Sequence, residues 1–333
     1  MRYTMLGRTG MKVSVLGCGT NMLSQFSQEQ ATEALNYALD RGVNLVETGS
    51  KTAYGVIEEM VGKAIAHRRD DYWLASKNVA LTEKETLRDV EQSLTSLQTD
   101  HLDLYELGNI RFQEQLDRVL RPGGALKGLI RCQREGKVNF IGITGHNPDI
   151  LAKALKAYPF DNVLFIFNMI HPYPLDELLP YAKGHGVGTF VMRPTGHGAL
   201  KPATRSLRFA LCSGADVVLS GMYSKAIIDE NIATAEPEPT PEEFQRLLQD
   251  ARRPGLTGCT ECGACACPQG ISVPTIMSLI YYRRAYGLQP AAEAMYRQQA
   301  ERAKNCNDCG ECEKRCPYKL TIIPVIHEAA REP

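Results

Sequence analysis

The chain has 333 residues, 38 basic and 38 acidic side chains, 44% apolar residues and 11 cysteines. A formal net charge of zero argues against a nucleic acid or an anionic membrane as a partner, and the longest apolar run, over residues 163–170, is far shorter than the ~20 residues of a membrane-spanning helix. Because no export signal opens the sequence, we expect a cytoplasmic protein.

Residues 1–234 alternate between strand-like and helix-like segments. After a predicted hairpin over 6–13, the expected strands are 13–16, 44–47, 72–76, 102–107, 139–143, 163–168, 188–192 and 217–221. Helical patterns lie between them, at 28–40, 58–67, 84–97, 113–134, 149–157, 176–185 and 206–212. This alternation predicts an α/β fold, a parallel (β/α)8 TIM barrel. A doubly wound sheet is disfavoured because residues 17–22 lack the third glycine of a dinucleotide-binding turn.

Composition marks the domain boundaries. Residues 235–241 are rich in proline and glutamate, and residues 252–255 form a second break. We therefore expect the barrel over 1–234, a linker and helix over 235–255, and a small domain over 256–333. Apolar positions recur at helical spacing between residues 268 and 305, so the small domain is predicted to be mainly helical.

Eight of the eleven cysteines lie in the small domain, in two runs: Cys259, Cys262, Cys265 and Cys267, then Cys306, Cys309, Cys312 and Cys316. The second run, followed by Pro317, has the spacing that holds a [4Fe–4S] cluster and sends its fourth thiolate to a second cluster. The first run is one or two residues short before its last cysteine, which leaves its fourth ligand open. Two tetrahedral zinc sites are the alternative, although such sites do not require a third cysteine two residues on.

In a (β/α)8 barrel, reactive groups gather at the carboxyl ends of the strands. Glu47 ends the second predicted strand, Tyr54 follows it, and Lys77 follows the third. A lysine cation lowers the pKa of a nearby phenol, which makes a tyrosine a proton donor, and a carboxylate holds the lysine in place.

These residues resemble the aldo-keto reductase family, and specifically its members with a C-terminal iron–sulfur domain. The resemblance is carried by residues 6–10, 13–17, 42–44, 54–55, 75–77, 102–105, 141–144 and 221–222, with Glu230, Asn231 and both cysteine runs. It implies the (β/α)8 barrel, a small-molecule substrate and NADPH-dependent carbonyl reduction by an Asp, Tyr, Lys and His tetrad.

Carried over residue by residue, Tyr54 matches the tyrosine acid and Lys77 the lysine beside it. Glu47 stands for the family's Asp, at a longer spacing from Tyr54, and Gly108 stands where the family has His. The missing imidazole removes a hydrogen-bond donor to the carbonyl, and family members that replace this His with another residue can reduce a C=C bond conjugated to a carbonyl instead. A bulkier substrate, a water, His146 or His197 is expected to fill the space beside Gly108.

The resemblance also implies the cofactor-binding residues. Asn147 and Asn168 would meet the nicotinamide amide, and Arg193 would lie near the pyrophosphate. The adenosine end would be surrounded by Ser220, Gly221, Met222, Lys225, Glu230 and Asn231. A serine, a lysine and backbone N–H groups at a helix start favour NADP over NAD.

The sequence therefore predicts an iron–sulfur oxidoreductase that uses NADP(H) to reduce a carbonyl or a conjugated C=C bond, with two [4Fe–4S] clusters relaying electrons, and with a redox protein as a further donor or acceptor. Two alternatives stay open. The barrel no longer uses NADP and acts on its substrate with help from the clusters, or it is a catalytically inactive electron-transfer or partner subunit.

Overall fold

The computed structural model describes residues 1–196, 200, 202–251, 259, 262–286 and 290–331. Its main body is a closed barrel of eight parallel strands in the order β10-β3-β4-β5-β6-β7-β8-β9. These strands are β3 (Leu16–Gly19), β4 (Leu45–Glu47), β5 (Trp73–Asn78), β6 (Leu102–Leu107), β7 (Val138–Gly145), β8 (Asn162–Ile166), β9 (Gly188–Met192) and β10 (Val217–Gly221). The predicted (β/α)8 barrel is confirmed.

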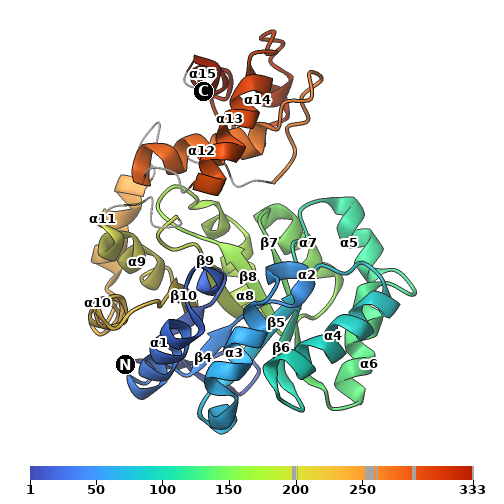
Figure 1. The fold of residues 1–333 in the computed structure, drawn as a ribbon, viewed down its shortest axis with the longest axis vertical. Coiled ribbons are helices and arrows are strands. Elements are labelled where there is room, and N and C mark those ends of the chain that lie inside the picture. Colours follow the sequence, from blue (N-terminus) through green and yellow to red (C-terminus); the bar gives the residue numbers. More distant parts are fainter. Residues whose placement is uncertain (197–199, 201, 252–258, 260–261, 287–289, 332–333) are drawn as a thin grey trace.

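Helices surround the barrel (Figure 1). They are α1 (Gln28–Asp40), α2 (Lys51–Tyr54), α3 (Ile57–Ile65), α4 (Glu83–Leu97), α5 (Gln113–Leu120), α6 (Ala125–Arg134), α7 (Pro148–Ala157), α8 (Leu178–Gly184), α9 (Ala203–Leu211) and α10 (Lys225–Ala235). Short 3-10 turns lie at Leu23–Gln25, Ala66–Asp71 and Tyr173–Leu175. Local sequence fixes several starts: Ser27 and Gln30 form a capping box at α1, and Thr82 caps α4.

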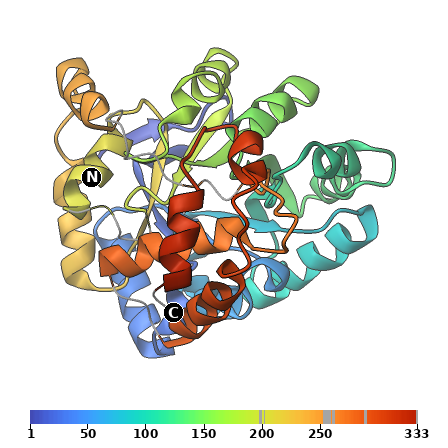
Figure 2. The ribbon, with the colours of Figure 1, turned by 90° about the horizontal axis from the view of Figure 1, so that it is seen from above.

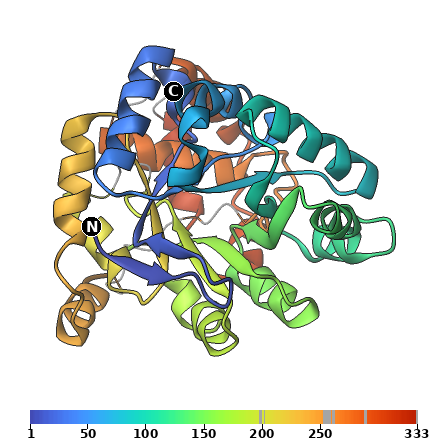
Figure 3. The same cartoon turned by 90° about the horizontal axis from the view of Figure 1, so that it is seen from below.

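The amino terminus differs from the prediction at one strand. Residues 13–16 are not a barrel strand, because β2 (Lys12–Ser14) pairs with β1 (Tyr3–Met5) in an antiparallel hairpin and β3 begins at Leu16. The hairpin loop buries Leu6 and Met11 among barrel-interior side chains, and Figure 3 shows the hairpin across the lower end of the barrel. The predicted hairpin is thus present, and the burial of its apolar side chains makes it a plug for this end of the barrel.

The predicted helix over 113–134 is divided into α5 and α6. Gly123 lies between them with φ of +78°, a left-handed conformation that glycine adopts without a steric penalty, and Pro122 precedes it. The Pro-Gly turn therefore ends the first amphipathic segment early and starts a second one.

The predicted linker contains helix α11 (Pro241–Ala251), which packs on the barrel. Arg208 on α9 pairs with Glu243 at 2.6 Å, and Ala251 is buried in the barrel core. The last part of the chain then crosses the carboxyl end of the barrel, opposite the hairpin plug (Figures 1 and 2). No helix among the described residues is both long and apolar enough to cross a membrane.

The described residues beyond 256 form helices α12 (Val273–Tyr286), α13 (Pro290–Ala303), α14 (Glu311–Arg315) and α15 (Ile323–Arg331). The single helical stretch expected over 268–305 is thus two helices. These elements share a small core of their own, which includes Ile276, Tyr296, Ile326 and the cysteines Cys312 and Cys316. The C-terminal module, as we call residues 259–331, therefore has a core that is separate from the barrel core.

Candidate active site and cysteine-lined hollow

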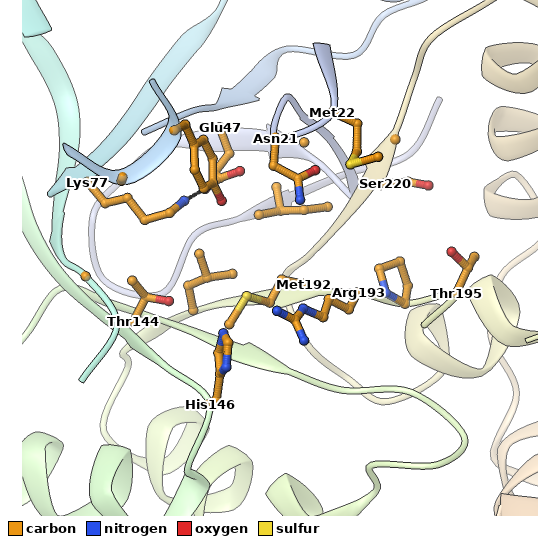
Figure 4. Close-up of a pocket in the computed structure, with 18 of the residues that line it drawn as sticks. Asn21, Met22, Glu47, Lys77, Thr144, His146, Met192, Arg193, Thr195 and Ser220 are labelled. Carbon is orange, nitrogen blue, oxygen red and sulfur yellow. Dashed lines mark ion pairs between the residues drawn. The ribbon is translucent and has the colours of Figure 1, made fainter. Parts of the chain in front are cut away.

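A cavity of about 510 Å³ opens at the carboxyl ends of the barrel strands, a size within the usual range for small-molecule sites. Its walls come from the ends of β4, β5, β7, β9 and β10 and from the segments that follow them. Figure 4 shows Glu47 and Lys77 on one wall, with His146, Met192 and Arg193 on the opposite wall.

Glu47 and Lys77 form a buried ion pair in this cavity. Glu47 ends β4 and Lys77 lies on β5, and both are almost fully buried. The Lys77 Nζ also donates a hydrogen bond to the backbone oxygen of Thr48 at 3.1 Å, and Figure 4 marks the ion pair. The glutamate therefore reaches the lysine despite its longer spacing from Tyr54.

Tyr54 ends the short helix α2 and lines the same cavity. The Lys77 Nζ lies 4.4 Å from the centroid of the Tyr54 ring, so the ammonium group lies against the face of the ring. Burial raises the pKa of the Tyr54 phenol well above its usual value, as does the nearby Glu106 carboxyl, whereas the Arg193 cation lowers it. The structure thus brings Glu47, Tyr54 and Lys77 together.

Gly108 is enclosed by backbone and leaves no room for a side chain. A Cβ atom at this position would lie 2.1 Å from the backbone oxygen of Asn78. The Gly108 N–H donates a hydrogen bond to that same oxygen at 2.7 Å. The main chain of β5 therefore leaves no room for a side chain at residue 108, whereas Gly108 itself lines the cavity together with His146.

A second carboxyl group, Glu106, lies behind the ion pair. Glu106 is on β6, directly opposite Lys77 in the strand register, and is 1% exposed. Burial raises the pKa of Glu106 to about 7, while the Lys77 cation opposes this shift. Burial likewise lowers the pKa of Lys77, and Glu106 opposes that shift. Lys77 therefore stands between two carboxyl groups in the barrel interior.

The residues predicted to bind the cofactor fall into two groups. Five of them line the cavity: Arg193, Ser220, Gly221, Glu230 and Asn231. The Asn231 amide donates to Ser220 Oγ at 3.2 Å and to the Gly221 oxygen at 3.1 Å, which ties α10 to the end of β10.

The other four predicted residues do not line the cavity. The Asn147 side chain accepts a hydrogen bond from the N–H of Asp149 and caps α7, and the buried Asn168 amide is bonded to backbone groups. Lys225 forms an exposed ion pair with Glu33, and Met222 is buried in the barrel core. Each side chain is thus held by another contact that sequence spacing did not reveal.

Further residues line the cavity without having been selected from the sequence, among them Asn21, Arg111, Thr195 and Tyr223. Each follows the carboxyl end of a barrel strand by a few residues, which is the signal that could have identified them. His146, considered as a neighbour of Gly108, also lines the cavity, whereas His197 lies outside the described residues.

The fold places cysteines of the first run close to cysteines of the second. An apolar hollow in the C-terminal module is lined by Cys259, Cys262 and Cys265 of the first run and by Cys316 of the second. The thiol of Cys267, by contrast, is close enough to Cys306 and Cys312 to contribute, after burial, to raising their pKa values. The last cysteine of each run therefore lies near cysteines of the other run.

The cysteine-lined hollow adjoins the barrel mouth. The Tyr318 ring, which also lines the hollow, packs against the ring of Tyr173 with centroids 4.0 Å apart. Gly263, between two cysteines of the first run, lies against the ring of Phe112, where a Cβ atom would meet that ring at 2.4 Å. Phe112 directly follows the cavity residue Arg111.

Comparisons with known proteins agree with this barrel. The sequence profile of the Aldo/keto reductase family matches residues 15–208, which end before the cysteine runs. The chain is 30% identical over 212 residues to L-galactose dehydrogenase of Arabidopsis thaliana, covering 59% of this chain and 66% of the relative. It is 27% identical over 208 residues to aldo-keto reductase YhdN of Bacillus subtilis (strain 168), covering 57% and 61%. The chain thus spans slightly less than two thirds of either relative.

A solved structure gives the same fold. The holo form of the aldo-keto reductase AKR11C1 from Bacillus halodurans superimposes with a TM-score of 0.68 at 22% identity, over 76% of this chain and 97% of that one. At that identity the likeness concerns the fold, and it leaves about a quarter of this chain unmatched.

Proposed function

The chain belongs to the aldo/keto reductase family, a family of oxidoreductases, and from that premise we propose that it reduces a carbonyl group, or a C=C bond conjugated to one, with NADP(H). The observation that carries this proposal is the cavity in which Tyr54, Lys77 and Glu47 meet.

Tyr54 acts as the proton donor in this proposal. The Lys77 ammonium lies against its ring, and a cation beside a phenol favours the phenolate that remains after proton transfer. Glu47 holds the lysine by the buried ion pair and so fixes the ammonium at the ring. A positioned proton donor of this kind contributes about 10²–10⁴-fold to a rate.

The cavity residues fit a nicotinamide cofactor. Ser220 and Gly221 lie at the end of β10, next to the start of α10, where backbone N–H groups favour an anionic phosphate. Glu230 and Asn231 on α10 complete this side of the cavity. When bound, NADPH supplies the hydride for the reduction.

Gly108 favours a conjugated substrate as the second candidate. Without an imidazole donor at this position, carbonyl polarisation loses a contact often worth about 3 kcal/mol in the transition state. An enone or a related unsaturated carbonyl compound is the test substrate for this branch.

The activity is tested with purified protein, NADPH and panels of aldehydes, ketones and enones. Tyr54→Phe is expected to lower kcat by about 10²-fold or more, while Tyr37→Phe, which removes a hydroxyl group bonded to Asp229 on the outer helices, leaves it unchanged. Saturable quenching of Trp73 or NADPH fluorescence reports cofactor binding. No quenching would support the alternative in which the barrel does not use NADP, and binding without turnover would support the inactive partner subunit.

We propose further that the C-terminal module holds two [4Fe–4S] clusters. Cys259, Cys262, Cys265 and Cys316 would hold one, and Cys306, Cys309, Cys312 and Cys267 the other. Sulfurs around a tetrahedral zinc with Zn–S bonds of ~2.3 Å lie about 3.8 Å apart. Among the described residues, the ligand atoms of Cys306, Asp308 and His327 lie within 4.8 Å of one another, a grouping that belongs to the zinc alternative and that metal analysis tests.

These clusters would relay single electrons near the barrel mouth, with a redox protein as donor or acceptor. The contacts of Tyr318 with Tyr173 and of Gly263 with Phe112 support this arrangement, because they hold the first cysteine set beside the cavity rim. A cytoplasmic location agrees with the chemistry, since such thiols stay reduced there. Anaerobically purified protein is expected to contain about eight irons per chain, and zinc in place of iron would disprove the clusters.

A further inference from the structure

Arg193 lies at the end of β9 in a strained backbone conformation. Its φ is +56°, in the left-handed region that few non-glycine residues adopt, at a cost of order 1–3 kcal/mol. The buried Asn168 holds this conformation, because its amide donates a hydrogen bond to the Arg193 oxygen at 2.8 Å. The Asn168 side-chain oxygen in turn accepts from the N–H groups of Ile170 and His171, at 3.0 and 3.1 Å.

The strained turn directs the guanidinium group into the cavity. Figure 4 shows it extended toward His146, facing the wall that carries Glu47 and Lys77. The charged and titratable groups that affect the Tyr54 phenol are Glu106, Arg193 and Tyr223, together with Lys77 against the ring, and Arg193 is the group that lowers the phenol's pKa. The guanidinium therefore lies within electrostatic range of the proposed proton donor.

The reaction needs a hydrogen-bond donor to the carbonyl oxygen, and residue 108 has no side chain to provide one. Hydride addition to a carbonyl carbon moves the C=O electron pair to the oxygen, and a preorganised N–H donor at that oxygen stabilises the developing charge. At Gly108 the backbone oxygen of Asn78 excludes any side chain. A planar guanidinium carries several N–H donors and a permanent positive charge.

We propose that Arg193 donates a hydrogen bond to the oxygen of the reacting carbonyl, and so takes over the polarising task for which position 108 has no side chain. This inference rests on the proposed reductase activity. In the step, NADPH is oxidised to NADP⁺ as its hydride reaches the substrate carbon, the C=O electron pair moves to oxygen, and Tyr54 supplies the proton. For a conjugated substrate the hydride would reach the β carbon, the C=C pair would move to the bond between the α and carbonyl carbons and the C=O pair to the oxygen that Arg193 contacts, and the proton from Tyr54 would go to the α carbon.

The competing role for Arg193 is the one expected from the resemblance, a contact with the cofactor pyrophosphate. The two roles predict different kinetic changes. A pyrophosphate contact changes the Kd of NADPH, whereas a donor to the reacting oxygen changes kcat and leaves that Kd unchanged.

The experiment compares Arg193→Gly, Arg193→Lys and wild type by NADPH fluorescence titration, steady-state kinetics and pH profiles. Glycine accepts the left-handed φ, so Arg193→Gly is expected to fold at least as stably as wild type. We expect kcat to fall about 10²-fold or more in Arg193→Gly, with the NADPH Kd unchanged and partial rescue of kcat by added guanidinium ion. Arg193→Lys retains part of kcat, and Arg41→Gln, at the C-cap of α1, retains all of it.

The pH profile gives a readout that a structural role would not move. Because the Arg193 cation lowers the pKa of Tyr54, its removal raises that pKa, and the alkaline decline of activity shifts to higher pH. A weakened NADPH Kd with kcat preserved would overturn the proposal in favour of the pyrophosphate contact. An Arg193→Gly variant that keeps both kcat and Kd would also overturn it. Wild-type protein that reduces no aldehyde, ketone or enone with NADPH would instead defeat the proposed function itself.

Discussion

In the barrel, several buried carboxylates form ion pairs with Lys or Arg side chains. In the C-terminal module, by contrast, the buried reactive groups are cysteines among apolar side chains. Glu47 pairs with Lys77, Asp103 with Arg69 at 2.7 Å, and Asp216 with Lys183 at 2.6 Å. The thiols of Cys262 and Cys316 lie instead beside Val273, Met277, Leu320 and Ile322.

This difference indicates what each region needs in order to fold. Buried charges remain stable when partners compensate the loss of solvation, and the barrel supplies those partners itself. A small core lined with thiols gains much of its stability only when the thiols bind a group that links them. We therefore expect the barrel to be stable alone and the C-terminal module to depend on its proposed clusters.

The largest expected effect is on the cysteine-lined hollow. Cys316→Ser is expected to reduce iron from about eight to about four per chain or lower, because one cluster loses the ligand that the second run gives to the first. Cys132→Ser, in the buried barrel core, is the matched control and should leave iron unchanged. Metal analysis and limited proteolysis measure both. A Cys316→Ser protein with full iron would contradict the assigned ligand set.

The buried ion pair offers the next test, within the barrel. Lys77→Met leaves the Glu47 carboxylate buried without its partner, and is expected to lower the free energy of unfolding by about 3–5 kcal/mol. The double variant with Glu47→Gln should recover most of this loss, because no uncompensated charge remains. Urea unfolding followed by the fluorescence of Trp73, the single tryptophan, measures the cycle. Strictly additive losses would show that the two residues do not interact.

The pH dependence of stability tests Glu58, a carboxyl group that forms no ion pair with any residue the structure describes. Burial raises the pKa of Glu58 to about 7, from 4.5, although Ser76 donates a hydrogen bond to it at 2.6 Å. The unfolded chain thus loses this proton first as pH rises, so the contribution of Glu58 to stability falls between pH 4.5 and 7.

Glu58→Gln is expected to remove this loss of stability with rising pH. The variant is expected to exceed wild type by up to about 3 kcal/mol at pH 8 and to match it below pH 4.5. Glu59→Gln, the exposed neighbour on α3, is the control and should not alter the pH dependence. Urea midpoints at the two pH values decide the matter, and equal shifts at both would refute the buried-carboxyl explanation.

The smallest expected effect concerns the packing at Gly108. Gly108→Ala forces a methyl group against the Asn78 oxygen and is expected to cost about 1–3 kcal/mol. At Gly184, in helix α8, an added methyl group would meet no atom within 4 Å, so Gly184→Ala should be neutral or gain about 0.4–1 kcal/mol. Thermal melting compares the two variants. Equal melting temperatures would show that the backbone at residue 108 moves to accommodate the methyl group.

Much of the architecture could be predicted because it depends on local patterns. Strand and helix periodicity indicated the barrel, and the carboxyl-end rule selected Glu47, Tyr54 and Lys77 before their positions were known. The first strand was misplaced because the apolar pattern of residues 13–16 is compatible with a hairpin strand as well as with a barrel strand. Only the burial of Leu6 and Met11 in the barrel interior distinguishes these two structures.

The sequence by itself determined the barrel and the two cysteine runs, because periodicity and ligand spacing are properties of neighbouring residues. The spacing of the second run already predicted that Cys316 leaves its own run for the other cluster, and the structure places it beside the first run. Only the tertiary structure decided that the main chain of Asn78 leaves no room for a side chain at residue 108, and that Arg193 faces the cavity. The structure likewise decided that the amide of Asn168, a residue expected at the cofactor, donates a hydrogen bond to the backbone oxygen of Arg193. These outcomes depend on strand register and barrel closure, which bring together residues far apart in the chain.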